Sequence, residues 1–192
     1  MLRQLFTYPY PDVALRNLSQ SMPNAPTHDA ITLITAAGAD IAYYQFAPHP
    51  DLTLAILFTA SYLFAGYACA GDLDLYSKEY RRWGPLRFIW WPYKQCIPHR
   101  SWMSHGLVMG GVIRVGYLAA VCTLLFWLSL WLYSRRGPHI DANQVTQAGW
   151  LSLYSFAHHH PDWTAVLFAG FILAGSAHSI ADGVSTWFKR RF

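Results

Sequence analysis

Four stretches of the chain consist almost entirely of apolar and small residues. Each is close to the roughly 20 residues that an α-helix needs to cross a bilayer. They cover residues 29–47, 52–70, 106–133 and 164–187. The first is the weakest, because Asp40 interrupts it, and the third is the strongest. The pattern predicts an all-α membrane protein, a four-helix up-and-down bundle formed by one domain over residues 1–192.

The composition agrees with a membrane protein. Hydrophobic residues make up 54% of the chain and charged residues 12%, whereas an ordinary soluble domain has roughly 25% charged residues. The formal net charge is +4, and the basic residues are clustered, which suits anionic lipid headgroups better than nucleic acid. We find no nucleic-acid-binding motif. Membrane lipids are therefore the expected partners, nucleic acid is not expected, and the oligomeric state stays open.

The segment between the second and third stretches, residues 75–98, has a different composition. Its basic residues are Lys78, Arg81, Arg82, Arg87 and Lys94, and they alternate with Tyr76, Tyr80, Trp83, Phe88, Trp90, Trp91 and Tyr93. Aromatic rings and cations are enriched together where a membrane meets water. We expect an interfacial segment between helices 2 and 3, which would serve either as an anchor or as a surface that recognises lipid headgroups.

The basic residues also predict an orientation. The region 75–100 and the C-terminal Lys189, Arg190 and Arg191 hold most of them, and positive segments favour the cytoplasm. Four spans then place both termini in the cytoplasm, in a multi-pass protein of the inner (plasma) membrane. A three-span alternative without residues 29–47 would leave His28 on the opposite face.

Histidine and aspartate residues stand at the ends of the predicted spans. They are His28 and Asp29 at the first, Asp72 and Asp74 at the second, His99 and His105 at the third, and His178 and Asp182 at the fourth. In an up-and-down bundle these four ends are neighbours on one membrane face. His178 and Asp182 are four residues apart, so they share one helix face. The pattern predicts a single polar site at the cytoplasmic helix ends.

A metal centre accounts for this cluster better than a network of charges alone. Carboxylates gathered without a cation would repel one another and shift towards the neutral form. The mixed nitrogen and oxygen donors suit a divalent transition metal, with Zn²⁺ favoured and Mn²⁺ or Fe²⁺ as alternatives, bound as one or two ions. Asp29 or Asp74 could instead orient a histidine ring. Because Glu79 is the only glutamate, a glutamate-rich di-iron site is excluded.

Several motifs together resemble an uncharacterised family of bacterial membrane proteins described as metal-binding. The motifs are Thr27-His28-Asp29, Gly71-Asp72-Leu73-Asp74, Trp83-Gly84-Pro85-Leu86-Arg87, Pro98-His99-Arg100-Ser101 and the run from His178 to Asp182. The same pattern more loosely resembles the membrane-bound metal-dependent hydrolases, and remotely the zinc-dependent phospholipase C fold. This resemblance implies the following metal ligands: His28, Asp72, Asp74, His99, His105, His178 and Asp182.

Three functional hypotheses follow. The first is a membrane-embedded metal-dependent hydrolase of an ester or phosphoester, with a lipid as a candidate substrate, Asp74 as a general base and Arg100 holding a phosphate. The second is a non-catalytic metal-binding membrane protein. A transporter is disfavoured, because apart from Asp40 and Arg114 the spans lack polar residues at mid-bilayer, and Arg114 is expected to snorkel to the surface. The third is a structural role for the polar cluster.

Overall fold

The structure is a computed structural model that describes residues 25–99 and 101–191. Within these ranges the chain is helical and has no strand, which confirms the predicted all-α class. The long helices are α2 (Ala25–Phe46), α3 (Leu52–Ala68), α7 (Met109–Ser134), α8 (Ala142–His159) and α9 (Pro161–Arg191). Between α3 and α7 lie η2 (Gly71–Asp74), α4 (Lys78–Arg82), η3 (Gly84–Trp90), α5 (Trp91–Cys96) and α6 (Trp102–His105).

Helices α3 and α9 form the most extensive helix pair in the described part of the chain, and α2 packs against both. Asp51 caps α3, because its side chain accepts hydrogen bonds from the backbone N–H groups of Thr53 and Leu54. Farther along α3, the Ser61 hydroxyl donates to the Leu167 carbonyl of α9 at 2.6 Å. The two backbones lie close together at Gly170, where a Cβ atom would lie only 2.6 Å from the carbonyl oxygen of Phe58. Small residues therefore set the spacing of this helix pair.

Replacing Gly170 with alanine should destabilise the protein by about 1–3 kcal/mol, because the added methyl group meets backbone rather than a side chain that could move aside. The matched control is Gly183→Ala on the same helix, where a Cβ atom would have no neighbour within 4 Å. Alanine is the better helix former, so the control should be neutral or slightly stabilised. Thermal unfolding in detergent measures both variants, and equal melting temperatures for the two would contradict the close α3–α9 packing.

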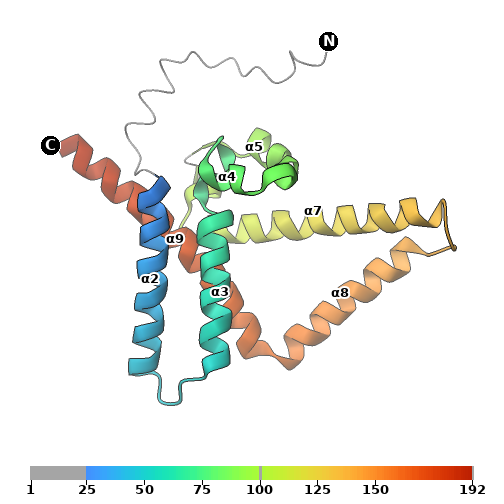
Figure 1. Cartoon of the computed structure of the whole chain (residues 1–192), viewed down its shortest axis with the longest axis horizontal. Coiled ribbons are helices and arrows are strands. Elements are labelled where there is room, and N and C mark those ends of the chain that lie inside the picture. Colours follow the sequence, from blue (N-terminus) through green and yellow to red (C-terminus); the bar gives the residue numbers. More distant parts are fainter. Residues whose placement is uncertain (1–24, 100, 192) are drawn as a thin grey trace, which may run out of the picture.

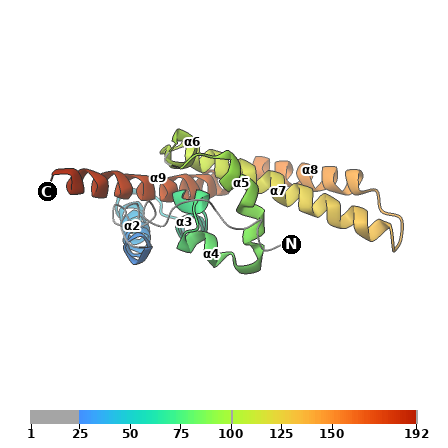
Figure 2. The ribbon, with the colours of Figure 1, turned by 90° about the horizontal axis from the view of Figure 1, so that it is seen from above.

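Helix α7 does not run alongside the others. Figure 1 shows it crosswise to α2 and α3, with α8 returning from its far end towards α9, and Figure 2 shows α2 and α3 nearly end-on while α7 extends sideways. Only its first turns are buried, at Gly110, Gly111 and Arg114. The predicted up-and-down arrangement of four helices is therefore not confirmed.

Within the described residues, three helical segments are long and apolar enough to cross a membrane, and this composition hints at a membrane protein. They are residues Leu52–Asp74, Met109–Ser134 and Pro161–Arg191. The predicted first span, residues 29–47, corresponds to α2, which is not among the three. The remaining three predicted spans coincide with α3, α7 and α9.

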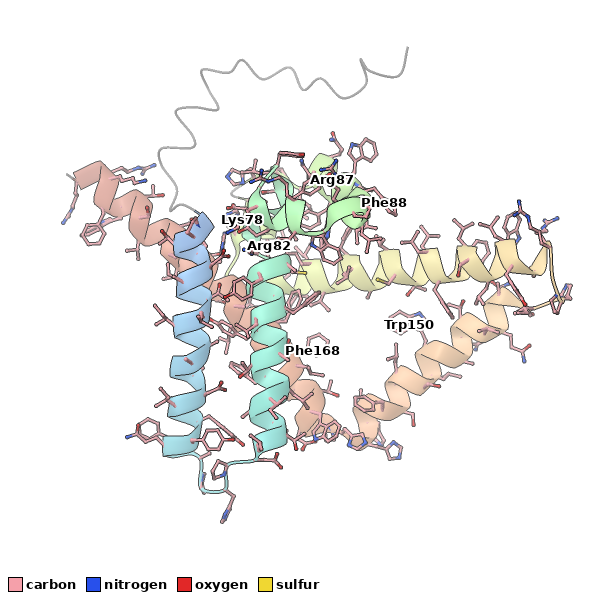
Figure 3. The ribbon with its side chains drawn as sticks, in the orientation of Figure 1. Lys78, Arg82, Arg87, Phe88, Trp150 and Phe168 are labelled. Carbon is pink, nitrogen blue, oxygen red and sulfur yellow. The ribbon has the colours of Figure 1, made fainter. Side chains whose placement is uncertain are left out.

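The aromatic and basic segment between α3 and α7 folds as a cap over the ends of these two helices (Figure 1). Trp90 and Tyr93 belong to the buried core, with 0% and 1% of their surface exposed, and the Trp90 ring stacks on Tyr117 of α7. On the outer side, Arg87 and Phe88 are exposed (Figure 3). The segment is thus a packed structural element, and only its outer side is available to an interface.

Candidate metal centre

Histidine and aspartate side chains from four parts of the chain meet beneath this cap. His28 comes from the start of α2, Asp72 from η2, His105 from α6, and His178 and Asp182 from successive turns of α9. Gly71 lets the η2 backbone approach the imidazoles, because a Cβ atom there would lie 3.1 Å from the His178 ring and 3.2 Å from His105 Nε2. The predicted convergence of these residues is present in the structure.

Four of these side chains form a first donor group: Asp72, His105, His178 and Asp182, whose ligand atoms all lie within 4.8 Å of one another. His105 Nε2 is 3.6 Å from Asp72 and 3.5 Å from Asp182, and His178 Nε2 is 3.7 and 3.5 Å from the same two carboxylates. These distances exceed the usual N–H···O range of about 2.7–3.2 Å. They are close to the ~3.4 Å that separates two ligands of a tetrahedral ion with ligand distances of about 2.1 Å.

The polar atoms that face the middle of this group have no hydrogen-bond partner. These buried atoms are Asp72 Oδ1, His105 Nε2, His178 Nε2 and both carboxylate oxygens of Asp182. Leaving one buried polar group unsatisfied costs about 1–3 kcal/mol, and more if it is charged. A divalent cation would bind all of them at once, so the residues fit a metal ion.

His28 borders the first donor group on the α2 side. Its ring stacks on that of His178, with the ring centroids 4.2 Å apart, and its Nε2 lies 3.2 Å from Asp182 Oδ1. The His28 side chain is 4% exposed, and both ring nitrogens lack a hydrogen-bond partner of good geometry. His28 is therefore placed either to bind metal or to hold the Asp182 carboxylate.

A second donor group consists of Asp74, His99 and His105. His99 Nδ1 lies 3.0 and 3.1 Å from the two oxygens of Asp74, and because an ionised carboxylate only accepts, Nδ1 carries the proton and donates. His105 Nδ1 is likewise 3.0 Å from the Ser104 hydroxyl. Partners of this kind fix the orientation of the ring and leave Nε2 free to bind a metal ion, as in many metal sites. Asp74 is thus arranged to orient His99.

Electrostatic contacts favour a proton on His105 when no metal is bound. Burial alone would lower the pKa of His105, but the contacts with Asp182 and Asp72 outweigh burial and raise it to about 9. A metal ion that binds His105 near neutral pH must therefore displace this proton.

Asp29 is drawn away from the centre. Its carboxylate pairs with Lys78 at 2.7 Å and with Arg82 at 2.6 Å, two residues of the cap that lie near the start of α2 (Figure 3). Burial alone would raise the pKa of Asp29, but the hydrogen bonds from Arg82 and Lys78 lower it below its usual value. Asp29 thus ties the cap to α2 and is in neither donor group.

The predicted position of Arg114 at the surface is wrong. Its side chain does not snorkel to the surface: it is 1% exposed, and Nη1 donates to the Ser104 carbonyl at 2.8 Å. The reason is local, because Gly175 of α9 leaves room for the guanidinium, which would be 2.5 Å from a Cβ atom at that position. Arg114 therefore supports the short α6 helix that carries His105. Arg100, predicted to hold a phosphate, lies outside the described residues.

Comparison with known families decides the class of the protein. A family model described as uncharacterized metal-binding protein (DUF2227) matches residues 23–192. The chain belongs to this family. The family's description gives metal binding as its property. The match covers every residue of both donor groups, so these aspartate and histidine side chains are the candidate ligands. No curated protein and no solved structure matches the chain.

Proposed function

We propose that this DUF2227 protein is a membrane-embedded metal-dependent hydrolase of an ester or phosphoester, with a lipid as the preferred substrate class. The observation that carries the proposal is the set of buried, unpartnered nitrogen and oxygen donors, which borders the surface at His99, whose side chain is 23% exposed although its Nε2 is buried. Structural metal sites are closed by protein ligands, whereas catalytic sites keep a position for water or substrate. The exposed edge at His99, which water or a substrate could reach, therefore supports a catalytic rather than a structural metal site.

Zinc is the ion we propose first, with manganese or iron as alternatives, because the donors are nitrogen and oxygen atoms. A bound divalent cation supplies Lewis-acid chemistry, since it activates water and stabilises negative charge that develops on the substrate. His105, His178, Asp72 and Asp182 would hold it. Asp74 accepts from His99 with both oxygens, which favours an orienting role over that of a free general base.

Membrane embedding is supported by the three long apolar helices and by the exposed apolar side chains of α7, among them Leu124, Phe126 and Leu132. We propose the inner membrane as the location, with both termini in the cytoplasm, because the cap and the C-terminal end of α9 are basic. Helix α7 runs crosswise to α3 in Figure 1. Both helices can therefore span one bilayer only if, in the membrane, α7 is oriented differently relative to α3.

The test uses full-length protein extracted from the membrane fraction with detergent and loaded with Zn²⁺ or Mn²⁺. We expect hydrolysis of a generic phosphomonoester, phosphodiester or carboxylic ester, or of phospholipid in mixed micelles, that a chelator removes and added metal restores. Asp182→Ala should lack this activity, and Asp162→Ala, which changes an exposed aspartate of the same helix, should retain it. Fully metal-loaded wild type without turnover on any of these substrates would overturn the hydrolase and leave a non-catalytic metal-binding protein.

A further inference from the structure

We propose that the centre binds two divalent cations side by side, with Asp72 bridging them. One ion is held by His178 and Asp182 with His28 beside them, and the other by His99 and His105. This inference rests on the proposed metal binding and adds the number of ions and the residues that separate them. It is carried by the count of free donors, by the placement of the two Asp72 oxygens and by the arrangement of the imidazole rings.

The number of buried nitrogen and oxygen atoms without a partner exceeds what one four-coordinate ion can bind. A single four-coordinate ion in the first donor group would use Asp72, His105, His178 and Asp182. It would leave Nε2 of His99 and Nε2 of His28 buried without a hydrogen-bond partner. Buried polar groups in folded proteins are rarely left in this state. A second ion would bind His99, which lies in a second donor group that shares His105 with the first. With His105 on the second ion, the first ion would have a position for His28.

Asp72 is placed between the two groups. Its Oδ1 faces His105 Nε2 at 3.6 Å, whereas its Oδ2 faces His178 Nε2 at 3.7 Å. The two oxygens of one buried carboxylate thus point to imidazoles that belong to different proposed ions. Asp182 lies on the His28 side through its Oδ1, which is 3.2 Å from His28 Nε2, whereas its Oδ2 lies 3.5 Å from both His178 and His105, so that Asp72 is the carboxylate whose two oxygens face different imidazoles of the two proposed ions.

The imidazole rings pair in the same way. The His28 and His178 rings stack, with centroids 4.2 Å apart, and the His99 and His105 rings meet edge to face at 5.1 Å. Between the two pairs the distance is larger, because the ring centroids of His105 and His178 are 6.2 Å apart. The Nδ1 atoms of His99 and His105 are both occupied, by Asp74 and Ser104 respectively. Each ring of the second pair therefore presents one nitrogen, Nε2, to the second ion.

The charge count permits two ions and indicates what they would bind. Asp72, Asp74, Asp182 and the buried Glu79, whose charge acts on His28, contribute four negative charges when ionised, and the buried Arg114 contributes one positive charge. Two divalent ions then leave an excess of one positive charge among these groups, if the histidines are neutral. An anionic phosphate group would offset this excess, so the two-ion centre favours a phosphoester over a neutral ester within the proposed hydrolase activity.

The experiment measures metal per chain in full-length protein saturated with Mn²⁺ and freed of excess metal. Wild type should hold two ions and show the electron paramagnetic resonance signal of a coupled Mn²⁺ pair. His99→Ala and His99→Gln should each hold one ion with an isolated Mn²⁺ signal. His158→Ala, which removes an exposed histidine of α8, should behave like wild type.

The outcomes separate this inference from the metal site itself. One ion per chain in saturated wild type, lost in Asp182→Ala, would overturn the second ion and leave the single-metal centre in place. No stoichiometric metal in wild type would overturn both. Thermal unfolding of the His99 variants shows whether they are folded, and two ions retained in both of them would overturn the assignment of His99.

Discussion

Replacing Asp182 with alanine should abolish binding of the metal ion at α9 while the helical fold persists. The Asp182 carboxylate is 5% exposed, and it lies within 3.2–3.5 Å of ring nitrogens of His28, His105 and His178. Its removal takes a negative charge and two oxygen donors from the middle of the cluster. Loss of a group that only supports a ligand costs roughly 10–100-fold in metal affinity, so loss of a ligand should cost more than about 100-fold.

Metal analysis and thermal unfolding with and without metal measure this effect. In wild type, a metal concentration of 100 times the Kd should stabilise the fold by about 2.7 kcal/mol, and Asp182→Ala should lose most of this gain. Asp162→Ala is the control, because this exposed aspartate stands in the first turn of the same helix. Wild-type metal content in Asp182→Ala would show that Asp182 is not a metal ligand.

Replacing Arg114 with methionine should weaken metal binding by roughly 10–100-fold without removing any ligand. Arg114 Nη1 holds the Ser104 carbonyl at 2.8 Å, and the Ser104 hydroxyl lies 3.0 Å from His105 Nδ1. Methionine keeps the long apolar stem but cannot donate to Ser104, so His105 would lose the support that fixes its ring. Isothermal titration calorimetry with Zn²⁺ measures the metal affinity of both proteins.

Gly175 offers an independent way to displace the same guanidinium. A Cβ atom at position 175 would lie 2.5 Å from Arg114 Nη2, which is the end of a flexible side chain. Gly175→Ala should therefore move Arg114 and weaken metal binding with little loss of stability. The double variant should be no weaker than Arg114→Met alone, because both changes act through one contact. Additive losses would show that Gly175 acts by another route, and Gly183→Ala serves as the unhindered control.

The metal cluster is largely predictable from the sequence, whereas the arrangement of the helices is not. His178 and Asp182 are four residues apart, which places them on one face of any helix, and His28, Asp72 and His105 lie at the ends of apolar runs, where connections bring helix ends together. The structure gathers all five. Their role as ligands stays a prediction, as does the relation to hydrolases.

The direction of α7 could not be predicted, because an apolar run shows that a helix is long and apolar but not which way it points. The burial of Arg114 could not be predicted for a similar reason: its partners, Gly175 and the Ser104 carbonyl, come from other elements and leave no signal near it in the sequence. Asp29 pairs with Lys78 and Arg82 only because the cap folds back onto α2. Each of these features depends on tertiary contacts, which local patterns do not encode.

We propose that histidine and aspartate side chains from separate helices hold a transition metal beneath the cap. X-ray absorption of the purified, metal-replete protein, combined with elemental analysis, tests it most directly. We expect at least one transition-metal ion per chain, with imidazole nitrogen and carboxylate oxygen as ligands and no sulfur, because Cys69, although buried, is in neither donor group. Protein without stoichiometric metal, or a metal bound by sulfur, would contradict metal binding by these histidine and aspartate side chains.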